Sequence, residues 1–399
     1  MAESALSRRL ILIMALAAGV GVANIYFPQA VTPLLARDLN VSEGAATTVA
    51  TTAQLGYAAG IVLLVPLGDR LPRRPLIVTM FGLVALGLFL AGTSNSLAVL
   101  AVCCAVVGAM TVVPQILIPM AADLAQGSAA PLGFVQGGLL GGILLARAFG
   151  GGLGQWLGWR APFLVAGVLT LLLAVTLLVA LPSTRSANRQ SYPALLGSAL
   201  RLARTEPELR RSCTYQALLF GAFTAAWTSI ALFLTGPAFG YGTSVVGLVA
   251  LVGAGSVFAV PVAGRWIDRR GPDLVNLVCF LGLGLAALVL LVGLAHGLAG
   301  LGALIVGMLL LDVSVQSSQV ANQARIFALV PGARTRLNSI YMTSVFLGGA
   351  AGSWLGARAY LAFGWWAVCA LVTLVAVVAL LRHLLRRDER AAEPSPVSA

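Results

Sequence analysis

The sequence predicts an all-α polytopic membrane protein with twelve transmembrane helices, arranged as two pseudo-symmetric six-helix bundles. Of its 399 residues, 59% are hydrophobic and only 10% are charged, whereas an average soluble domain is roughly 25% charged. The mean hydropathy is +0.96, spread along the chain. So few charges cannot cover a soluble globule of this size, which excludes that class. Two further observations, twelve apolar runs and an internal repeat, define the architecture.

Each apolar run is long enough to cross a bilayer as a helix, which takes about 20 residues. The first run follows Arg8 and Arg9 and holds small residues, as a signal peptide does, but it stays apolar to Leu35 and eleven more runs follow, which favours a membrane span. The twelve runs are 10–35, 46–68, 75–93, 96–122, 131–156, 161–182, 212–236, 244–264, 274–295, 298–322, 337–356 and 365–381.

The placement of arginine predicts the orientation of these helices. The 25 basic residues are all arginine, and they cluster between the apolar runs rather than on one solvated face, which argues against a nucleic-acid partner. If the N-terminus is cytoplasmic, 21 of the 25 fall on the inner side. Basic residues accumulate on the cytoplasmic side of membrane proteins. We therefore expect a multi-pass protein of the cell inner membrane with both termini cytoplasmic.

A polar stretch divides the chain into two halves. We expect an N-terminal six-helix half at 1–182, a cytoplasmic linker at 183–211, a C-terminal six-helix half at 212–382 and a cytoplasmic tail at 383–399. Within the linker, leucine and alanine alternate with Arg201 and Arg204 at a helical period. This pattern predicts an amphipathic helix on the inner membrane face.

The two halves repeat each other in sequence. The fifth run ends GGGLGQWLGWR at 150–160, and the eleventh ends GGAAGSWLGAR at 348–358, with seven of eleven positions identical. A second pair, Asp69-Arg70 and Asp268-Arg269, recurs at nearly the same offset. Duplicated six-helix units are typical of secondary transporters, because such a pair can rock around a shared site at mid-membrane.

The first of these loops resembles a family motif. Residues 65–74 read VPLGDRLPRR, similar to the motif GxLxDRxGRR of the major facilitator superfamily, and 264–271 read GRWIDRRG in the second half. The neighbourhoods of Gln54 to Tyr57, Val112 to Gln115 and Arg336 to Tyr341 further resemble its drug:proton antiporter and nucleoside-exporter-like branch. The resemblance implies transport by alternating access, with a cavity lined by spans one, four, seven and ten.

Charged residues in the two repeated loops are candidate cytoplasmic gating residues. Asp69 is expected against the N-terminal end of span eleven, near Asn338, where the helix dipole favours a carboxylate. The arginines would then latch the halves together; the alternative is that they serve only as positive-inside anchors around a tight turn. The candidates are Asp69, Arg70, Arg73, Arg74, Asp268, Arg269 and Arg270.

Two formally charged side chains lie deep in spans, Arg147 in the fifth and Asp312 in the tenth. Ions at this depth are costly and usually mark a function or a pair. In the family the two spans approach each other, so motion that changes the separation of Arg147 and Asp312 would drive proton uptake and release. The alternatives are a permanent structural ion pair and an Arg147 that holds an anionic substrate.

Polar and aromatic residues within the spans are candidates for a substrate cavity. Gln316, Gln319 and Gln323 follow Asp312 along one helical face, which would be unfavourable toward lipid. Each candidate could instead make an ordinary interhelical hydrogen bond. Together they suit an uncharged or weakly charged amphipathic molecule. The set is Asn24, Gln54, Tyr57, Thr111, Gln115, Gln136, Gln216, Phe223, Trp227, Gln316, Gln319 and Tyr341.

Two departures from the antiporter pattern bear on mechanism. Cys104 stands where such proteins carry an arginine in span four, and Arg147 stands where they carry a proline in span five. The five cysteines lack metal-ligand spacing and read as small apolar side chains. His296 at an outer loop and His383 in the tail have no plausible buried nucleophile or metal partner, so we expect no enzyme activity, cofactor or metal.

The sequence thus predicts a secondary transporter that exports a small organic compound, a drug or metabolite, in exchange for protons, and so contributes to drug resistance. Its partners would be this small-molecule substrate, protons and the lipid bilayer, and we expect a monomer. The alternatives are proton-coupled uptake of a metabolite and a membrane receptor that keeps the fold without transport.

Overall fold

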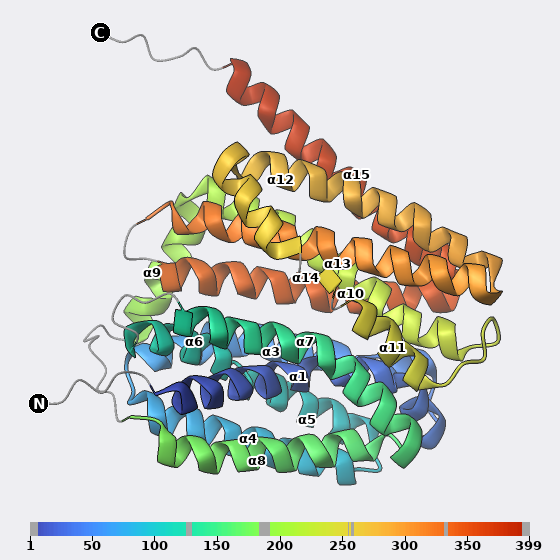
Figure 1. The fold of residues 1–399 in the computed structure, drawn as a ribbon, viewed down its shortest axis with the longest axis horizontal. Coiled ribbons are helices and arrows are strands. Elements are labelled where there is room, and N and C mark those ends of the chain that lie inside the picture. Colours follow the sequence, from blue (N-terminus) through green and yellow to red (C-terminus); the bar gives the residue numbers. More distant parts are fainter. Residues whose placement is uncertain are drawn as a thin grey trace, which may run out of the picture.

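The computed structural model describes residues 7–124, 130–182, 192–253, 255–256, 259–330 and 334–392. Across these ranges the chain forms helices joined by turns, and the long helices run side by side (Figure 1). In chain order they are α1 (Arg8–Asp38), α2 (Glu43–Ala46), α3 (Thr48–Leu63), η1 (Val65–Asp69), α4 (Arg73–Thr93), α5 (Leu97–Met110), α6 (Val113–Leu124), α7 (Ala130–Leu157), α8 (Arg160–Ala180), α9 (Tyr192–Thr205), α10 (Pro207–Thr235), α11 (Thr243–Gly253), α12 (Ala259–Leu291), η3 (Val292–Ala295), α13 (Gly297–Phe327), α14 (Arg334–Phe363) and α15 (Trp365–Ala392).

The predicted fold class is confirmed. Ten stretches of the described chain are helical, long and apolar enough to cross a membrane. With the shorter apolar α11 and the 30-residue α14, they follow the order of the twelve predicted runs. The predicted run 244–264 is not a single α-helix among the described residues: α11 ends at Gly253, residues 255–256 are 3-10 helix, and α12 begins at Ala259. A kink at Gly271 (φ 79°) then redirects α12, in a conformation that favours glycine.

The helices of the two halves occupy separate parts of the molecule. Figure 1 shows α1 and α3–α8 in its lower part and α10 and α12–α15 in its upper part. Within each part, two helices approach through glycine. In the first half, a Cβ atom added at Gly142 of α7 would lie 2.1 Å from the Gly19 carbonyl oxygen of α1. In the second half, a Cβ atom added at Gly352 of α14 would lie 2.0 Å from the Gly221 carbonyl oxygen of α10. Glycine is therefore required at these crossings.

The two groups of helices meet along a contact between α7 and α11, which we call the seam and define as Gly151, Gln155, Thr243 and Gly247. A Cβ atom at Gly151 would lie 2.4 Å from the Thr243 carbonyl oxygen, and the Thr243 backbone N–H donates to Gln155 Oε1 over 2.8 Å. Nearby, Thr51 of α3 donates to Ser353 of α14 over 3.4 Å. The seam therefore joins the halves mainly through backbone.

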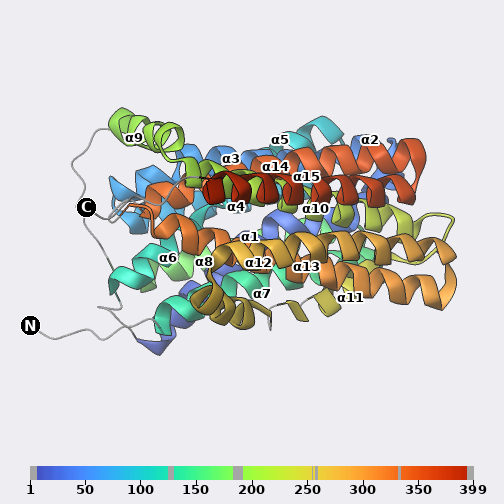
Figure 2. The same cartoon turned by 90° about the horizontal axis from the view of Figure 1, so that it is seen from above.

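Helix α9 lies apart from the long helices at one end of the molecule (Figure 2). The Tyr192 hydroxyl donates to the Leu63 carbonyl over 2.8 Å, and Arg336 Nη1 donates to Ser198 Oγ over 3.1 Å. Of the predicted linker, residues 183–191 lie outside the described residues, and its end belongs to α10, which begins at Pro207. Arg201 and Arg204 of α9 are exposed, as expected for a helix on a membrane surface.

Candidate functional site

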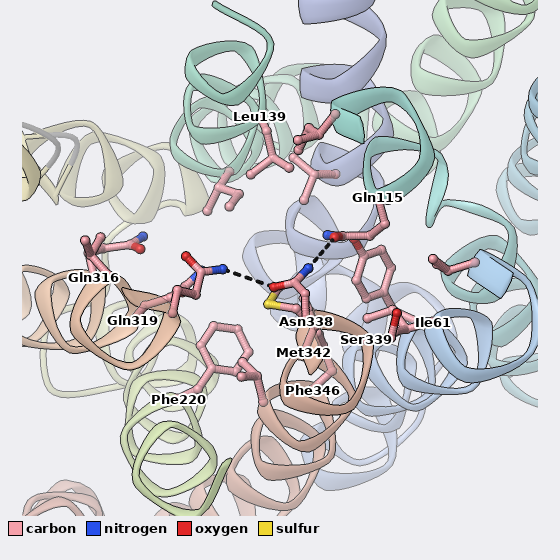
Figure 3. Close-up of a pocket in the computed structure, with 18 of the residues that line it drawn as sticks. Ile61, Gln115, Leu139, Phe220, Gln316, Gln319, Asn338, Ser339, Met342 and Phe346 are labelled. Atoms are coloured by element: carbon pink, nitrogen blue, oxygen red, sulfur yellow. Dashed lines mark hydrogen bonds between the residues drawn. The ribbon is translucent and has the colours of Figure 1, made fainter. Parts of the chain in front are cut away.

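A cavity of about 570 Å³ lies between the two groups of helices (Figure 3). This volume falls within the range of roughly 300–1,000 Å³ that is usual for small-molecule sites. Among the described side chains, its lining is mostly aliphatic and aromatic, with amides and one arginine, and includes no carboxylate. The lining residues are Val22, Tyr26, Tyr57, Ile61, Val65, Gln115, Ile118, Pro119, Leu139, Ile143, Phe220, Phe223, Val315, Gln316, Gln319, Val320, Gln323, Phe327, Arg334, Asn338, Ser339, Met342, Val345 and Phe346.

The cavity reaches the end of the molecule that is opposite the seam. Phe327 is the last residue of α13, Arg334 is the first of α14, and Val65 follows α3, and all three line the cavity. These positions adjoin the loops that hold most of the arginines. The seam and the contact between α3 and α14 close the other end. Among the described residues, the cavity lining thus extends to the arginine-rich end of the helices.

A row of polar side chains crosses the cavity from one group of helices to the other. Gln115 of α6 donates to the Tyr57 hydroxyl over 3.2 Å, Asn338 Nδ2 of α14 donates to Gln115 Oε1 over 3.5 Å, and Gln323 of α13 donates to Asn338 Oδ1 over 3.4 Å. Figure 3 shows the Asn338 amide between its two partners. The two longer bonds are near the limit for a hydrogen bond, so a ligand with polar groups can replace them.

Five of the predicted cavity residues line the cavity, namely Tyr57, Gln115, Phe223, Gln316 and Gln319. Six others lie elsewhere in the protein interior. Four of these make hydrogen bonds: Asn24 to Thr170, Gln216 to the Val315 carbonyl, Trp227 to Asp312 and Tyr341 to the Gln319 carbonyl. Gln54 and Thr111 are buried without a side-chain partner in the described part of the chain. The side chain of Gln136 lies outside what the structure describes.

Trp227 lies between Arg147 and Asp312, the two charged residues that the sequence places deep in the spans. The guanidinium carbon of Arg147 sits 4.3 Å from the Trp227 ring centroid, and Trp227 Nε1 donates to Asp312 Oδ1 over 3.0 Å. Among the described residues Arg147 and Asp312 form no direct ion pair; Arg147 instead donates through Nε and Nη2 to Gln29 Oε1. We call these residues, Gln29, Arg147, Trp227 and Asp312, the indole bridge. All four are buried.

The indole bridge touches the cavity through aromatic rings. The Arg147 guanidinium also stacks on Tyr26 and Phe223, at 5.1 and 5.2 Å from the ring centroids, and both residues line the cavity. A cation over an aromatic face is stabilised by the ring quadrupole, most strongly where water is excluded. Arg147 is therefore held by aromatic faces and one amide oxygen rather than by a carboxylate.

A second set of charges lies where α10, α12 and α13 meet. Arg211 contacts Glu208 at 3.3 Å and Asp273 at 2.6 Å, and Arg325 contacts the same two carboxylates. We call these four residues the ion cluster. His383, expected in the tail, is instead buried within α15, with Nδ1 3.4 Å from Arg211 Nη2.

The predicted gating residues lie at the turn between η1 and α4 in the first half and on α12 in the second, where the sequence predicts a loop. Arg70 is exposed, and Arg73 Nε donates to the Gly68 carbonyl of its own loop over 3.4 Å; Arg74 is half-buried. The side chain of Asp69 lies outside the described part of the structure. In the second half Asp268, Arg269 and Arg270 are exposed on α12. The latch between halves stays a prediction.

Sequence reasoning missed several residues of these sites. Gln29 follows Pro28 in an apolar run, and its spacing of five residues from Asn24 puts the two on different helix faces, so the sequence carries no signal for it. Glu208 and Asp273 each directly follow a proline near a helix break, where an acid beside several arginines is a signal for an ion pair. Met342 and Phe346 gave no signal, because apolar residues fill most of that span.

A multi-pass helical protein with a cavity between its two halves has an architecture typical of membrane transporters. Comparison with known families agrees: the model of the Major Facilitator Superfamily matches residues 10–294 and 238–399, and the chain belongs to this family.

Individual relatives are consistent with this membership. The chain is 40% identical over 378 residues to a protein named uncharacterized transporter YgaY of Escherichia coli O157:H7, covering 94% of this chain and 95% of that one. It is 33% identical over 246 residues to a chloramphenicol resistance protein of Streptomyces lividans, covering 60% and 61%. The fold is similar to the crystal structure of the nucleoside transporter NupG, with a TM-score of 0.74 and 14% identity over 94% and 98% of the chains.

Proposed function

We propose that this protein exports an uncharged or weakly charged amphipathic organic compound from the cytoplasm in exchange for protons. The observation that carries the proposal is the cavity: its aromatic and aliphatic walls are crossed by a row of amides, and the side chains that the structure describes there include no carboxylate. Such a lining favours apolar rings bearing hydrogen-bonding groups. It offers no counter-charge to an organic cation.

The direction of transport follows from the placement of charge. The described cavity lining extends to the loops that hold most arginines, and basic loops accumulate in the cytoplasm. The protein would then lie in the inner membrane with both termini cytoplasmic, and the described conformation would accept substrate from inside. Rocking of the halves 1–182 and 212–382 would open the seam and release it outside, with the loops around Asp69 and Asp268 as gates.

Proton coupling would use Asp312. This carboxyl is the only acidic side chain buried within the described transmembrane helices away from their ends, and it lies beside Arg147 through Trp227. Buried ionisable residues in membrane helices commonly mark proton pathways. Protonation from outside would remove its negative charge, and release to the cytoplasm would restore it.

Chloramphenicol is a suitable first probe, because it is uncharged and amphipathic and because a relative is named for resistance to it. In inverted vesicles that contain the protein, radiolabelled chloramphenicol should accumulate when the lumen is made acidic, and collapse of the pH gradient should release it. Vesicles without the protein are the control. Accumulation only in right-side-out vesicles with an acidic exterior would instead establish proton-coupled uptake.

A further inference from the structure

The indole of Trp227 contacts both the buried carboxyl and the buried guanidinium, the first through a hydrogen bond and the second through its ring face. In the described residues, Asp312 accepts its side-chain hydrogen bond from Trp227 Nε1, and the Arg147 guanidinium rests on the same ring at 4.3 Å. The ring is only 1% exposed. A change of charge at Asp312 therefore reaches Arg147 through this side chain.

The chemistry of the indole suits this position. An N–H donor binds an ionised carboxylate roughly twice as strongly as a neutral acceptor. The indole face attracts a cation through its quadrupole. When Asp312 takes up a proton, the hydrogen bond from Nε1 weakens, and so does the electrostatic attraction across the ring. The position of the indole then depends on whether Asp312 carries charge.

Both ends of this connection touch α11, which forms the seam. A Cβ atom added at Gly253 of α11 would lie 2.5 Å from Asp312 Oδ2 and 3.6 Å from Trp227 Cζ2. Six residues earlier, a Cβ atom at Gly247 would lie 2.9 Å from Ala148 Cα and 3.3 Å from the Arg147 carbonyl oxygen. A shift of the indole, Arg147 or Asp312 therefore presses directly on the helix that closes the cavity.

Few other charges compete at this depth. The titratable or charged groups facing Asp312 are Arg147 from α7 and, beyond it, Tyr26 from α1. Helix α11 contributes Gly253. The charged residues of α12 lie at 265–273, around its kink at Gly271, and those of α14 lie near its ends. Tyr341 of α14 donates to the Gln319 carbonyl.

We propose that Trp227 is a positioning residue that transmits the charge state of Asp312 to Arg147 and thereby to the seam between α7 and α11. This inference rests on the proposed proton coupling at Asp312. It adds a specific atom, the indole Nε1–H, whose removal should separate proton binding from seam opening while leaving an aromatic face for Arg147.

Hydrogen–deuterium exchange of the purified full-length protein at pH 5.5 and pH 8, corrected for the intrinsic effect of pH, tests this without a substrate. In the wild-type protein, seam peptides covering 148–155 and 243–247 should exchange several-fold differently at the two pH values. Trp227→Phe should abolish the difference. Trp365→Phe is the matched control, because Trp365 is equally buried but donates its Nε1–H to the Leu290 carbonyl at 2.9 Å, away from both charges.

The variant Asp312→Asn distinguishes the positioning role of Trp227 from the proposed proton coupling at Asp312. Loss of the pH difference in Asp312→Asn and Trp227→Phe, with retention in Trp365→Phe, supports the inference. Loss in Asp312→Asn but retention in Trp227→Phe overturns the role of Trp227 and leaves the proposed coupling intact. No pH difference in the wild type, or a difference that survives in Asp312→Asn, contradicts proton coupling itself. Equal loss in both tryptophan variants shows a merely structural effect and also overturns the inference.

Discussion

The indole bridge and the ion cluster bury arginine in opposite ways. Arg211 and Arg325 of the ion cluster share Glu208 and Asp273, so each positive charge meets negative charge at contact distance. Arg147 of the indole bridge meets an amide oxygen and aromatic faces. Paired charges hold one geometry, whereas a charge on neutral partners responds to a nearby proton. The comparison assigns a holding role to one site and a responsive role to the other.

The largest expected effect is the removal of charge from the indole bridge. Asp312→Asn should lower gradient-driven accumulation of chloramphenicol in inverted vesicles by at least about tenfold, or 1.4 kcal/mol, because no proton can bind. Exchange of substrate at equal pH on both sides should persist, since the cavity lining does not include Asp312. If Asp312→Asn retains full gradient-driven accumulation, the indole bridge does not couple protons. It would then have no responsive role that distinguishes it from the ion cluster.

The ion cluster should instead respond in stability. Asp273→Asn leaves two guanidiniums with a single shared carboxylate, and since Asp273 is itself half-exposed the cost should be about 1–3 kcal/mol, below that of a fully buried pair. The thermal midpoint of the purified protein should fall by several degrees. Asp268→Asn, an exposed acid on the same helix, should leave it unchanged. Equal midpoints for the two variants would show that the cluster does not hold the helices together.

A single substitution would make the indole bridge resemble the ion cluster. Gln29→Glu places a carboxylate at the oxygen that already accepts two hydrogen bonds from Arg147. A permanently paired Arg147 should respond less to Asp312, so gradient-driven accumulation should fall three- to fivefold, roughly 1 kcal/mol. Gln29→Met, which removes the acceptor without adding charge, is the comparison variant. Unchanged accumulation in Gln29→Glu would mean that neutral partners are not what makes this site responsive.

The smallest expected effect lies in the cavity. Asn338→Ala removes both long hydrogen bonds of the amide row and should weaken chloramphenicol binding two- to threefold, about 0.5 kcal/mol, without changing the pH dependence of transport. Isothermal titration of the purified protein measures the binding. A change in pH dependence would place Asn338 with the indole bridge instead of the cavity.

The fold followed from the sequence because a membrane span is a local property. Each span needs about 20 apolar residues in a row, whichever helices surround it. The interruption between Gly253 and Ala259 was missed, because an apolar run does not show where its helix breaks.

The candidate site followed only in part, for a related reason. Gln316 and Gln319 share one face of a single helix, a periodicity that can be read from the sequence, and both lie in the described cavity lining. Trp227 bridges residues of α7 and α13, so its partners depend on how three helices pack. Gln54 is likewise buried at a crossing between α3 and α14, where only the packing distinguishes cavity from interior.

The glycines of the seam also offer a way to trap the transporter. An added methyl group at Gly151 would collide with the Thr243 carbonyl oxygen, whereas one at the adjacent Gly152 would meet no heavy atom within 4 Å. The added methyl group in Gly151→Ala should therefore keep α7 and α11 apart at the seam. Gly152→Ala should behave as the wild type. A pair of proteins that differ by the position of one methyl group would let structural work capture the conformation that is the reverse of this one.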